Sequence, residues 1–477
     1  MILLLTVKNE IGTLRAAAIT TTPPSLSFSF IHPFIDIIVV IMSSALLLHD
    51  DYCIALYYIY LGIPDAKHHV KFHQELCKRL SLKGRIRVSA KEGLNGVLSG
   101  RIQDLQLYEE EFLGQLTTIN PQLQKSDLDL KYCRLRTDLT VQEQLFETLQ
   151  VKETKTVIGL VDLPRKEEKS RKTKKRQVKN QQELSDSELV RQVYEKAMEQ
   201  FAKEKQQGAL ASACSNEGSD KDSMHVPHLS PEEWDRQLSG LSEQPEQSVV
   251  FLDCRNVYES NVGRFESPHT KTVLTNTRKF SELPQVLVEQ SQELSKSTHI
   301  FAYCTGGVRC ERATVFLKGL LRETHPDRPI PQIFQLRGGI QRYLEHAAVA
   351  QQGNEELDPK SNNNSLFKGK NFVFDPRRVD PLNAHDKVVG RCLVCHEPHD
   401  DYDNGQAPAL DRASRCWNCR VLILVCNQCR SQVSCWGDDD DDDDDAKTNV
   451  LPRMYCGGPN QTCWHRPPVQ IVTGKNG

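Results

Sequence analysis

The chain has 477 residues, too many for one ordinary hydrophobic core, so we expect two to four domains joined by polar linkers. Hydrophobic residues make up only 38%, and the formal net charge is −3. This near balance hides an uneven placement, because basic residues crowd 165–179 whereas aspartates fill 438–445. The composition therefore argues against a single compact unit, and the net charge alone indicates no partner.

The distribution of cysteines argues against a secreted disulfide scaffold. Nine of the sixteen fall between Cys392 and Cys463, largely in C-x-x-C pairs. Such clustering is typical of a metal site in a reducing compartment. We therefore expect a cytoplasmic protein.

Residues 1–48 form an N-terminal extension that contains the apolar run FIDIIVVIMSSALLL. Asp36 interrupts this run, which is shorter than the roughly 20 apolar residues of a membrane-spanning helix, so we expect no stable membrane insertion. Two interpretations stay open. The extension is either an organelle-targeting segment or an artefact of the gene model, with Met42 as the true start.

Residues 49–163 are predicted to form a small α+β domain, because runs of β-forming residues alternate with apolar stripes of helical spacing. The expected elements are a strand from Tyr52, a helix over 69–80, strands at 85–89 and 96–99, a helix at about 102–117 and a further strand in DLKYCRLRT. Gly93 and Asn95 mark the turn between the two middle strands.

Residues 164–226 are predicted to be a charged, mobile insertion outside the catalytic core. Residues 164–180 hold nine Lys or Arg against two Glu, a composition typical of a solvated chain. Within the insertion, Ser185 and Glu188 form a capping box that predicts a helix, which could dock on a neighbour. Its apolar stripe consists of Leu189, Val193, Tyr194, Ala197 and Phe201.

Residues 227–350 alternate buried strands with helices, a pattern that predicts a parallel sheet with helices on its faces. Ligands of such α/β sheets bind at the carboxyl ends of the strands. Cys304 directly follows the predicted strand 299–303 and is therefore expected at the site. A connecting segment, 351–390, and a Cys-rich region, 391–466, complete the chain.

The loop that begins at Cys304 suits an anionic sulfur. A thiol of ordinary pKa is a weak nucleophile at neutral pH, but backbone N–H groups, a helix N-terminus and an arginine each favour its thiolate. Here Gly306 and Gly307 let the backbone curl, a helix begins at about Cys310, and Arg309 adds a charge. Cysteine phosphatases place five residues between Cys and Arg, whereas four stand here, so the ring of N–H groups fits one sulfur atom. The intervening loop residues are Thr305, Gly306, Gly307 and Val308.

Three C-x-x-C pairs in the region 391–466 predict structural zinc. Each pair supplies two thiolates and tetrahedral zinc takes four ligands, so one or two ions are expected. Which cysteines share an ion stays open, with His396, His399 and His465 as alternative ligands. The predicted ligands are Cys392, Cys395, Cys416, Cys419, Cys426, Cys429, Cys435 and Cys463.

The segments LDCRNVYE, YCTGGVRCERA and LRGGI resemble a rhodanese domain, in which the position of Cys304 carries a persulfide. The wider chain is similar to the tRNA uridine hydroxylase family in KGRIRVSAKEGLNGVLSG, SPEEW, FKGKNFVFDPR and the Cys-rich tail, over about 52–163 and 228–465. This resemblance implies a ferredoxin-like (acylphosphatase-like) N-terminal domain, a rhodanese-type parallel sheet with flanking helices and a zinc-binding tail. Bacterial members are implied to convert the wobble uridine of tRNA to 5-hydroxyuridine, with dioxygen as co-substrate.

The resemblance also implies roles for residues around the loop. Cys304 is the expected catalytic nucleophile, assisted by Arg309. Asp253, Arg255 and Glu259 match the rhodanese D-x-R-x-x-x-E pattern and are expected to form an ion-pair network that holds the loop. Two further residues are open: Cys310 either resolves an oxidised or persulfidated Cys304 or simply faces the core, and Arg337 is expected to line the same cleft.

Three functions are weighed from the sequence. The first is a tRNA-modifying hydroxylase in which Arg85, Arg87 and Lys91 contact RNA phosphates. The second is a sulfurtransferase with a donor or acceptor protein or small molecule. The third is a zinc adaptor without catalysis, against which the intact Cys304 and Arg309 argue. No sequence pattern is typical of a flavin, haem or 2-His-1-carboxylate iron site, so hydroxylation rests on the resemblance, whereas the persulfide also follows from the loop.

Overall fold

The computed structural model describes the following residues: 49–135, 140–160, 181–206, 223–242, 244, 246–352, 365–372, 379–380, 387–402, 414–435 and 451–473. The N-terminal extension, the basic run 165–179 and the aspartate run 438–445 lie outside these residues, so the interpretations placed on them stay predictions. Among the described helices, none combines the length and apolar character needed to cross a bilayer.

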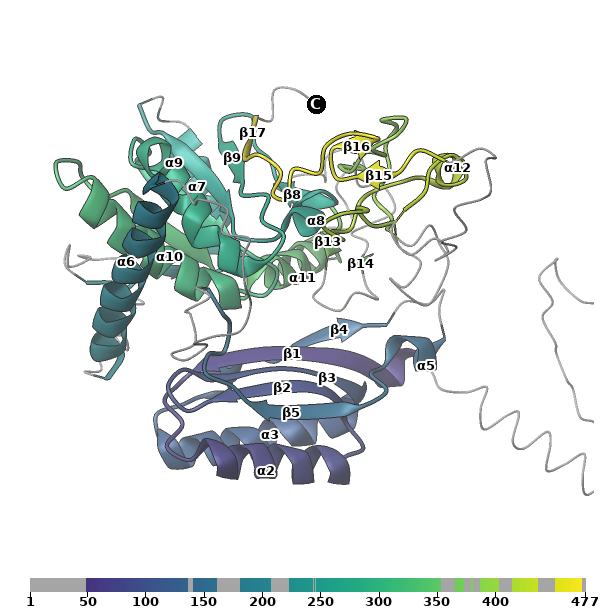
Figure 1. Ribbon diagram of the computed structural model, residues 1–477. Coiled ribbons are helices and arrows are strands. Elements are labelled where there is room, and N and C mark those ends of the chain that lie inside the picture. Colours follow the sequence, from purple (N-terminus) through teal and green to yellow (C-terminus); the bar gives the residue numbers. More distant parts are fainter. Residues whose placement is uncertain are drawn as a thin grey trace, which may run out of the picture. The chain divides into compact units, whose positions relative to one another are not determined.

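The N-terminal domain is a five-stranded sheet with its two long helices on one face (Figure 1). Its elements are β1 Tyr52–Tyr60, α2 Ala66–Arg79, β2 Lys83–Ser89, β3 Gly93–Arg101, α3 Ile102–Ile119, α4 Lys125–Leu128, β4 Lys131–Arg134, α5 Val141–Gln144 and β5 Leu149–Glu153, preceded by the 3-10 helix His49–Asp51. The strand order is β4-β1-β3-β2-β5, and only β2 and β5 pair in parallel. The short α5 and the edge strand β5 were not predicted from the sequence.

The two faces of this sheet differ in character because alternate strand residues point to opposite sides. In β1, Cys53, Ala55, Tyr57 and Ile59 belong to the core beneath α2 and α3. Tyr58 and the other residues between these therefore point to the face without helices. That face is the one available to a second domain or a ligand.

The second domain is a parallel sheet covered by helices, as predicted. Its elements are β6 His228–Leu229, α7 Pro231–Ser242, β7 Val249–Asp253, α8 Val257–Ser260, β8 Gly263–Phe265, β9 Lys271–Leu274, the 3-10 helix Phe280–Glu282, α9 Leu283–Leu294, β10 His299–Tyr303, α10 Val308–Thr324, β11 Gln332–Leu336 and α11 Gly339–Gln352. The strand order is β17-β9-β7-β10-β11-β6, in which only β17 (Gln470–Thr473) pairs antiparallel.

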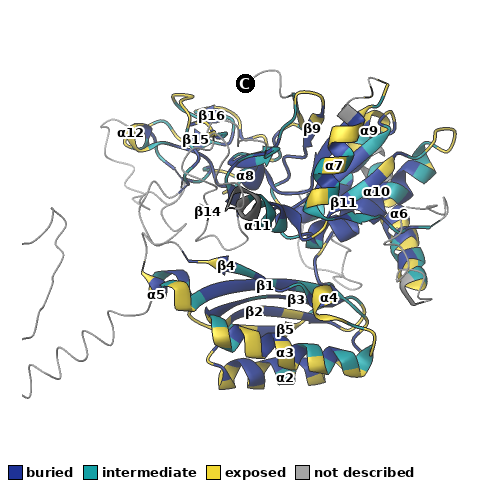
Figure 2. Ribbon diagram, turned by 180° about the vertical axis from the view of Figure 1, so that it is seen from behind, coloured by how far each residue is buried: buried dark blue, intermediate teal, exposed yellow. Residues whose placement is uncertain are grey.

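The central strand β10 shows how both faces are buried. Ile300 and Ala302 pack in the core that includes α9 and α10, whereas Phe301 and Tyr303 pack in the core that includes α7 and α11. The strands at the centre of this sheet are dark blue, that is buried, in Figure 2. This burial on both sides explains the near-continuous apolar runs in the sequence.

The interpretation of 164–226 as a mobile insertion is corrected in its central part. Helix α6, Gln181–Gln206, packs its apolar stripe against the parallel-sheet domain, where Val193 and Tyr194 are buried in the same core as Phe316 of α10. Gly319 permits this contact, because a Cβ atom there would lie 3.0 Å from the Cβ of Ala197. The predicted stripe was therefore a docking face, whereas 161–180 and 207–222 lie outside the described residues.

The Cys-rich region has little regular structure and is tied to the parallel-sheet domain at several points. Its short elements, with those that lead to it, are β12 Phe367–Gly369, β13 Asn371–Phe372, β14 Val379–Asp380, α12 Asn427–Arg430, β15 Met454–Tyr455 and β16 Gly458–Pro459. Strand β12 pairs with β8, and β17 returns the chain to β9. The core of this region also includes Val257 of α8, so it packs against the segment that follows β7.

Candidate active site

The Cys304 loop lies where the sequence placed it, between the end of β10 and the start of α10. The backbone N–H of Gly307 donates a hydrogen bond to Cys304 Sγ at 3.1 Å. Gly307 has a φ of 92°, which only glycine adopts without strain, whereas a Cβ at Gly306 would meet nothing within 4 Å. Of the two glycines, Gly307 is therefore the one that the loop conformation requires.

Opposing effects set the pKa of Cys304. Its complete burial would raise the pKa, but a hydrogen bond with the Cys310 side chain, the charge of Arg309 and the backbone N–H groups of Cys310 and Arg309 together lower it to about 6. The thiolate is then the main form at neutral pH. The loop can therefore hold a nucleophilic or persulfidated sulfur.

Arg309 acts on the loop from within a buried ion pair. Its guanidinium donates to both oxygens of Glu259, at 2.6 and 2.5 Å, and both side chains are 1% exposed. Thr305 is linked to both, since its hydroxyl donates to Glu259 at 2.8 Å and accepts from Arg309 at 2.9 Å. Arg309 is thus held in place by Glu259, with its charge beside Cys304.

A second buried ion pair supports the end of β7. Arg255 donates to both carboxylate oxygens of Asp253, at 2.9 and 2.7 Å. The hydroxyl groups of Ser260 and Tyr303 also donate to Asp253, at 2.9 and 3.0 Å. Asp253, Arg255 and Glu259 are therefore placed to hold the ends of β7 and β10 and the start of α10.

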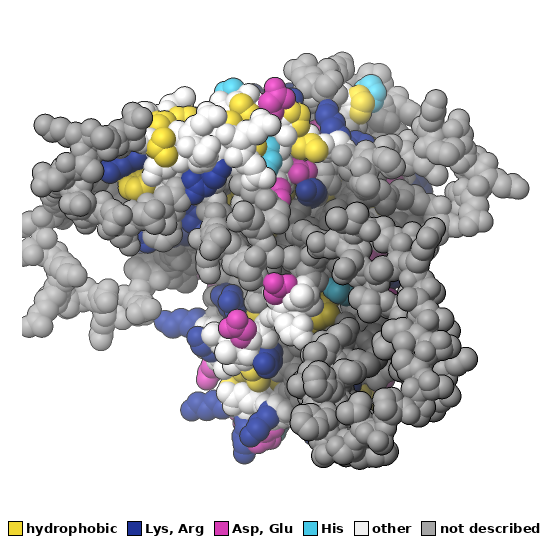
Figure 3. Space-filling model, turned by 90° about the vertical axis from the view of Figure 1, so that its right-hand side faces the viewer, with side chains coloured by type: hydrophobic (Ala, Val, Ile, Leu, Met, Phe, Trp, Pro, Cys, Tyr) yellow, Lys and Arg dark blue, Asp and Glu magenta, His cyan; other side chains and the backbone are white. Residues whose placement is uncertain are grey.

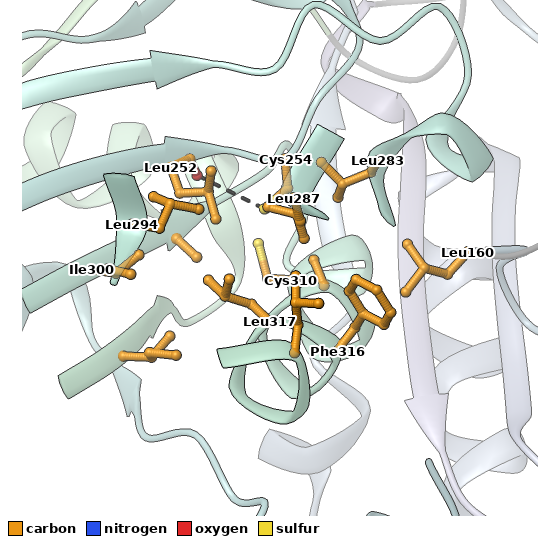
Figure 4. Packing of buried hydrophobic residues seen from close by; sticks show 14 of the residues in the cluster. Leu160, Leu252, Cys254, Leu283, Leu287, Leu294, Ile300, Cys310, Phe316 and Leu317 are labelled. Carbon is orange, nitrogen blue, oxygen red and sulfur yellow. Dashed lines mark hydrogen bonds between the residues drawn. The ribbon is translucent and has the colours of Figure 1, made fainter. Parts of the chain in front are cut away.

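Cys310 faces the core and also contacts the Cys304 side chain. It belongs to the same buried cluster as Cys254 and Leu317, which lie beside it in Figure 4. Burial raises the pKa of Cys310 well above its usual range, and hydrogen bonds with the Cys254 and Cys304 side chains raise it further. Both interpretations of Cys310 are thus compatible with its position. Cys254, a third neighbouring thiol, was missed because nothing local in the sequence marks it.

Arg337 is exposed, whereas the glycines after it hold the loop. Gly339 has a φ of 67°, and a Cβ there would lie 2.5 Å from the carbonyl oxygen of Cys304. The backbone N–H of Ile340 donates to that same carbonyl at 3.0 Å. The LRGGI motif therefore contributes through its backbone, and the cleft position expected for Arg337 stays a prediction.

The N-terminal domain also contributes to the site, through residues that the sequence did not single out. A Cβ at Gly307 would lie 2.7 Å from the Tyr58 hydroxyl, so this side chain contacts the loop closely. Tyr60 donates to the carbonyl of Val308 at 3.1 Å, and Arg312 pairs with Glu92 at 3.3 Å. Cys304 itself is 0% exposed. The N-terminal domain therefore packs against the residues that follow Cys304, and the sulfur itself is buried.

The three basic residues predicted to contact RNA lie in or next to β2, and all are exposed. Arg87 aligns with Asn95 of β3, which aligns with Tyr58 of β1, so all three share one face of the sheet. Lys152 of β5 continues the same row beyond Arg87 and was not predicted. Arg85 points to this face as well, and Lys91 stands in the turn after β2.

The cysteines of the tail form two groups of four, each with all sulfur atoms within 4.8 Å of one another. The first group is Cys392, Cys395, Cys426 and Cys429, and the second is Cys416, Cys419, Cys456 and Cys463. The sulfur of Cys395 lies 3.8 Å from that of Cys426, and the sulfur of Cys463 lies 3.7 Å from those of Cys416 and Cys456. Tetrahedral zinc with bonds of about 2.3 Å would place its sulfurs about 3.8 Å apart, so both groups fit such an ion.

The two groups differ from the predicted set of ligands at two cysteines. Cys456 completes the second group, although it was left out of the predicted ligands, and Cys435 lies outside both groups. The two groups alternate along the chain, so a cysteine's distance in sequence does not show which group it joins. None of the alternative ligands His396, His399 and His465 belongs to either group.

Comparisons with known proteins agree with this architecture. A family model described as UPF0176 acylphosphatase like domain matches residues 52–157, and one described as Rhodanase C-terminal matches residues 368–436. The first match covers the N-terminal domain, and the second covers β12 and most of the Cys-rich region, so the two matches flank the parallel-sheet domain that carries the Cys304 loop. The predicted fold class is confirmed.

Two curated relatives cover most of the chain. Rhodanese-like domain-containing protein 6 of Arabidopsis thaliana is 29% identical over 80% of this chain, which spans about half of that protein, 51%. The tRNA uridine(34) hydroxylase of Shouchella clausii is 28% identical over 77% of this chain and 84% of its own length. Among solved structures, the As-Sb reductase from Leishmania major matches with 15% identity and a TM-score of 0.21, covering 33% of this chain and 93% of that one.

Proposed function

We propose that this protein is an enzyme that hydroxylates the wobble uridine of tRNA to 5-hydroxyuridine with dioxygen. The observation that carries the proposal is Cys304, a buried thiol of lowered pKa at the carboxyl edge of the parallel sheet, in a chain similar to proteins named tRNA uridine(34) hydroxylase. In this proposal Cys304 is the catalytic nucleophile and Arg309 stabilises its anionic form.

The overall reaction has a defined balance. One oxygen atom of dioxygen replaces hydrogen as the C5 hydroxyl of uracil, and the other leaves as water, which requires two electrons and two protons from a reductant. A pair of thiols supplies both by forming a disulfide. Cys304 and Cys310, whose side chains hydrogen-bond, would provide such a pair, to be regenerated by an external thiol.

The tRNA would bind across the sheet face of the N-terminal domain that lacks helices. Arg85, Arg87 and Lys152 are exposed on that face, and Tyr58 continues the row of Arg87 to the Cys304 loop. Cations supply affinity for phosphates, and an aromatic ring can stack on an unpaired base. This arrangement would lead a single-stranded anticodon loop toward the sulfur.

In this proposal the two cysteine groups bind one structural zinc ion each. Such ions contribute folding free energy and leave no open ligand position, so they would support the tail without reacting. Because zinc thiolates need reduced cysteines, we propose that the protein works in the cytoplasm.

A sulfurtransferase is the second candidate, because the same loop would stabilise a persulfide on Cys304 through Gly307 N–H. Incubating the protein with unmodified tRNA under labelled dioxygen, and separately with labelled thiosulfate, would show by nucleoside mass spectrometry whether oxygen or sulfur is transferred. We expect labelled oxygen in 5-hydroxyuridine and no product from Cys304→Ser. Full activity of a folded Cys304→Ser protein in both assays would overturn the role of this loop.

A further inference from the structure

A histidine and a carboxylate form a pair close to the Cys304 loop. His228 Nε2 lies 2.7 Å from a carboxylate oxygen of Glu311, the residue that follows Cys310 in α10. The side chain of His228 is 25% exposed, whereas that of Glu311 is 10% exposed. We propose that His228, Glu311 and Tyr58 form a proton relay from solvent to the reacting sulfur. The inference rests on the proposed function and deepens it by naming the source of one proton.

The proton balance of the proposed reaction calls for such a relay. Reduction of one oxygen atom of dioxygen to water takes two electrons and two protons. The Cys304–Cys310 pair supplies both electrons when its disulfide forms, but it carries only one proton while Cys304 is a thiolate. Uridine, dioxygen, one thiolate, one thiol and one further proton then give 5-hydroxyuridine, water and the disulfide. Because the sulfur is buried, a chain of side chains is a suitable path for this further proton.

His228 forms the outer end of the relay and stands on the same face of the sheet as the sulfur. It aligns with Gln335 of β11, which aligns with Ala302 of β10, so the three side chains point to one face. Ala302 and Cys304 belong to one buried core, on the face that α10 covers. Glu311 of α10 contacts this row through His228, whose partial exposure opens the pair to solvent. Imidazole takes up and releases protons near neutral pH, as the outer end of a relay requires.

Tyr58 forms the inner end of the relay, at the loop itself. A Cβ atom at Gly307 would lie 2.7 Å from the Tyr58 hydroxyl, and the N–H of Gly307 donates to Cys304 Sγ. Glu311 stands four residues after Gly307, one turn along the same side of α10, and helical side chains tilt back toward the N-terminus. Burial, followed by the charges of Glu311 and Cys304, raises the pKa of Tyr58 well above its usual range. The phenol therefore keeps its proton until a reacting oxygen takes it.

The position of His228 distinguishes it from other histidines. Histidine side chains are visible at several places on the surface in Figure 3 (cyan), so exposure alone does not mark a site. His346 also pairs with a carboxylate, Glu232, at 3.1 Å, but on the face of the sheet that α7 and α11 cover. Beside His228 lie the ring of His225, 6.4 Å away between centroids, and Lys318, whose Nζ donates to the His225 carbonyl at 3.0 Å. His346 therefore provides a matched control for His228.

The test compares His228→Gln with His346→Gln in the full chain. The glutamine amide can keep a hydrogen bond to Glu311 but cannot pass on a proton, so a purely structural role would survive the substitution. We expect His228→Gln to lower kcat for tRNA hydroxylation about 100-fold, with little change in KM for tRNA, and added imidazole to restore part of the loss. His346→Gln should behave like the wild type. Thermal unfolding and the absorbance of the Cys304 thiolate verify that fold and loop are intact.

Tyr58→Phe tests the inner end, because it keeps the ring and removes the hydroxyl. We expect a similar loss of kcat, but no recovery with imidazole, since the missing group lies between Glu311 and the sulfur. The double variant Tyr58→Phe/His228→Gln should lose no more than either single variant, because residues that act as one unit are not additive. Multiplying losses would mean that the two residues act separately and would overturn the relay.

A second readout needs no tRNA and separates the relay from the proposed function. Hydrogen peroxide oxidises the Cys304 thiolate to a sulfenic acid, and the hydroxide that leaves takes up one proton to become water. Mass spectrometry of the Cys304 peptide should show slower oxidation in His228→Gln than in the wild type, with recovery in imidazole. If His228→Gln matches the wild type in both assays, the relay is overturned. If the wild type modifies no tRNA while its oxidation still depends on His228, the proposed function fails and the relay stands.

Discussion

The thiolate of Cys304 depends on neighbours that outweigh its burial. Because its folded pKa is lowered to about 6, the thiolate should be present above pH 6 and lost as the pH falls through that value. Cys310→Ala removes a hydrogen bond to the sulfur and should move the midpoint upward by about one pH unit, the size of one such bond. Ultraviolet difference titration against Cys304→Ser measures the midpoint, and a midpoint near 8.5 in the wild type would contradict the geometry of the loop.

The two glycines of the loop provide a matched pair of substitutions. Gly307→Ala should destabilise the fold by about 1–2 kcal/mol or more, because its φ of 92° is strained for alanine and the new Cβ would lie 2.7 Å from Tyr58. Gly306→Ala should change the free energy of unfolding by less than about 0.5 kcal/mol, since open space surrounds it. Denaturant unfolding of both variants decides the point; equal losses would show that the loop differs from this description.

At the scale of single residues, the sequence predicted only features whose residues lie within one short segment. Cys304, Gly307 and Arg309 stand within one short loop, so their spacing alone indicated an anionic sulfur. Glu259, which holds Arg309, could be named only from a resemblance. Tyr58 and Cys254 reach the site through pairing and packing of distant segments, and no local pattern encodes such contacts.

Among the elements, helix α6 shows where composition misleads. Its flanks are strongly charged, which indicated a mobile insertion, yet its apolar stripe packs against α10. Phe201 is 4% exposed and contacts Met224 and Val315 in a small core, so Phe201→Ala should cost about 3–5 kcal/mol. Lys203→Ala, at an exposed position of the same helix, should cost less than about 0.5 kcal/mol. Equal stability of both variants in denaturant would mean that α6 does not dock.

A second test at the scale of elements concerns the metal ligands of the cysteine tail. It compares two buried cysteines, one inside and one outside the groups of four. Cys456 belongs to the second group of four, whereas Cys435 lies outside both groups. We expect two zinc ions per chain in the wild type and in Cys435→Ser, and one in Cys456→Ser, because a three-thiolate site binds zinc much more weakly. Metal analysis of the purified proteins gives the count. Loss of an ion from Cys435→Ser with full occupancy in Cys456→Ser would reverse the assignment.

The tail also shows what the spacing of cysteines in the sequence cannot predict. Three C-x-x-C pairs predicted zinc ligands, but the groups combine the first pair with the third and the second pair with two single cysteines. Which pairs share a group is decided by how the chain folds back on itself, and in the core of the tail Met454 is buried together with cysteines of both groups. Spacing therefore gives the kind of site and leaves its membership open.

For the molecule as a whole, we expect the contacts between the two domains to govern access to Cys304. Beside the tyrosines that touch the loop, Arg342 of α11 pairs with Asp129, and its guanidinium also donates to the carbonyl of Leu130 at 3.0 Å. These contacts join the acylphosphatase-like domain to the segment that begins with Gly339. Since Cys304 is 0% exposed, loosening them should expose the sulfur more often.

Asp129→Asn tests this gating. Asp129 adopts a left-handed φ of 41°, which asparagine tolerates, so the substitution removes the charge and leaves the backbone unstrained. The pair with Arg342 is about one-third exposed, with side chains at 34% and 29%, and is worth up to about 1 kcal/mol, which corresponds to a roughly fivefold change in the open fraction. Asp129 also pairs with the buried Lys131 at 2.7 Å, so this figure is a lower bound. Alkylation of Cys304 by iodoacetamide, followed by mass spectrometry of its peptide, should therefore be at least about fivefold faster than in the wild type. Glu293→Gln, which breaks an exposed pair with Lys296 elsewhere, should leave the rate unchanged. An unchanged rate in Asp129→Asn, with normal stability, would show that the sulfur is reached by a route that does not require the domains to part.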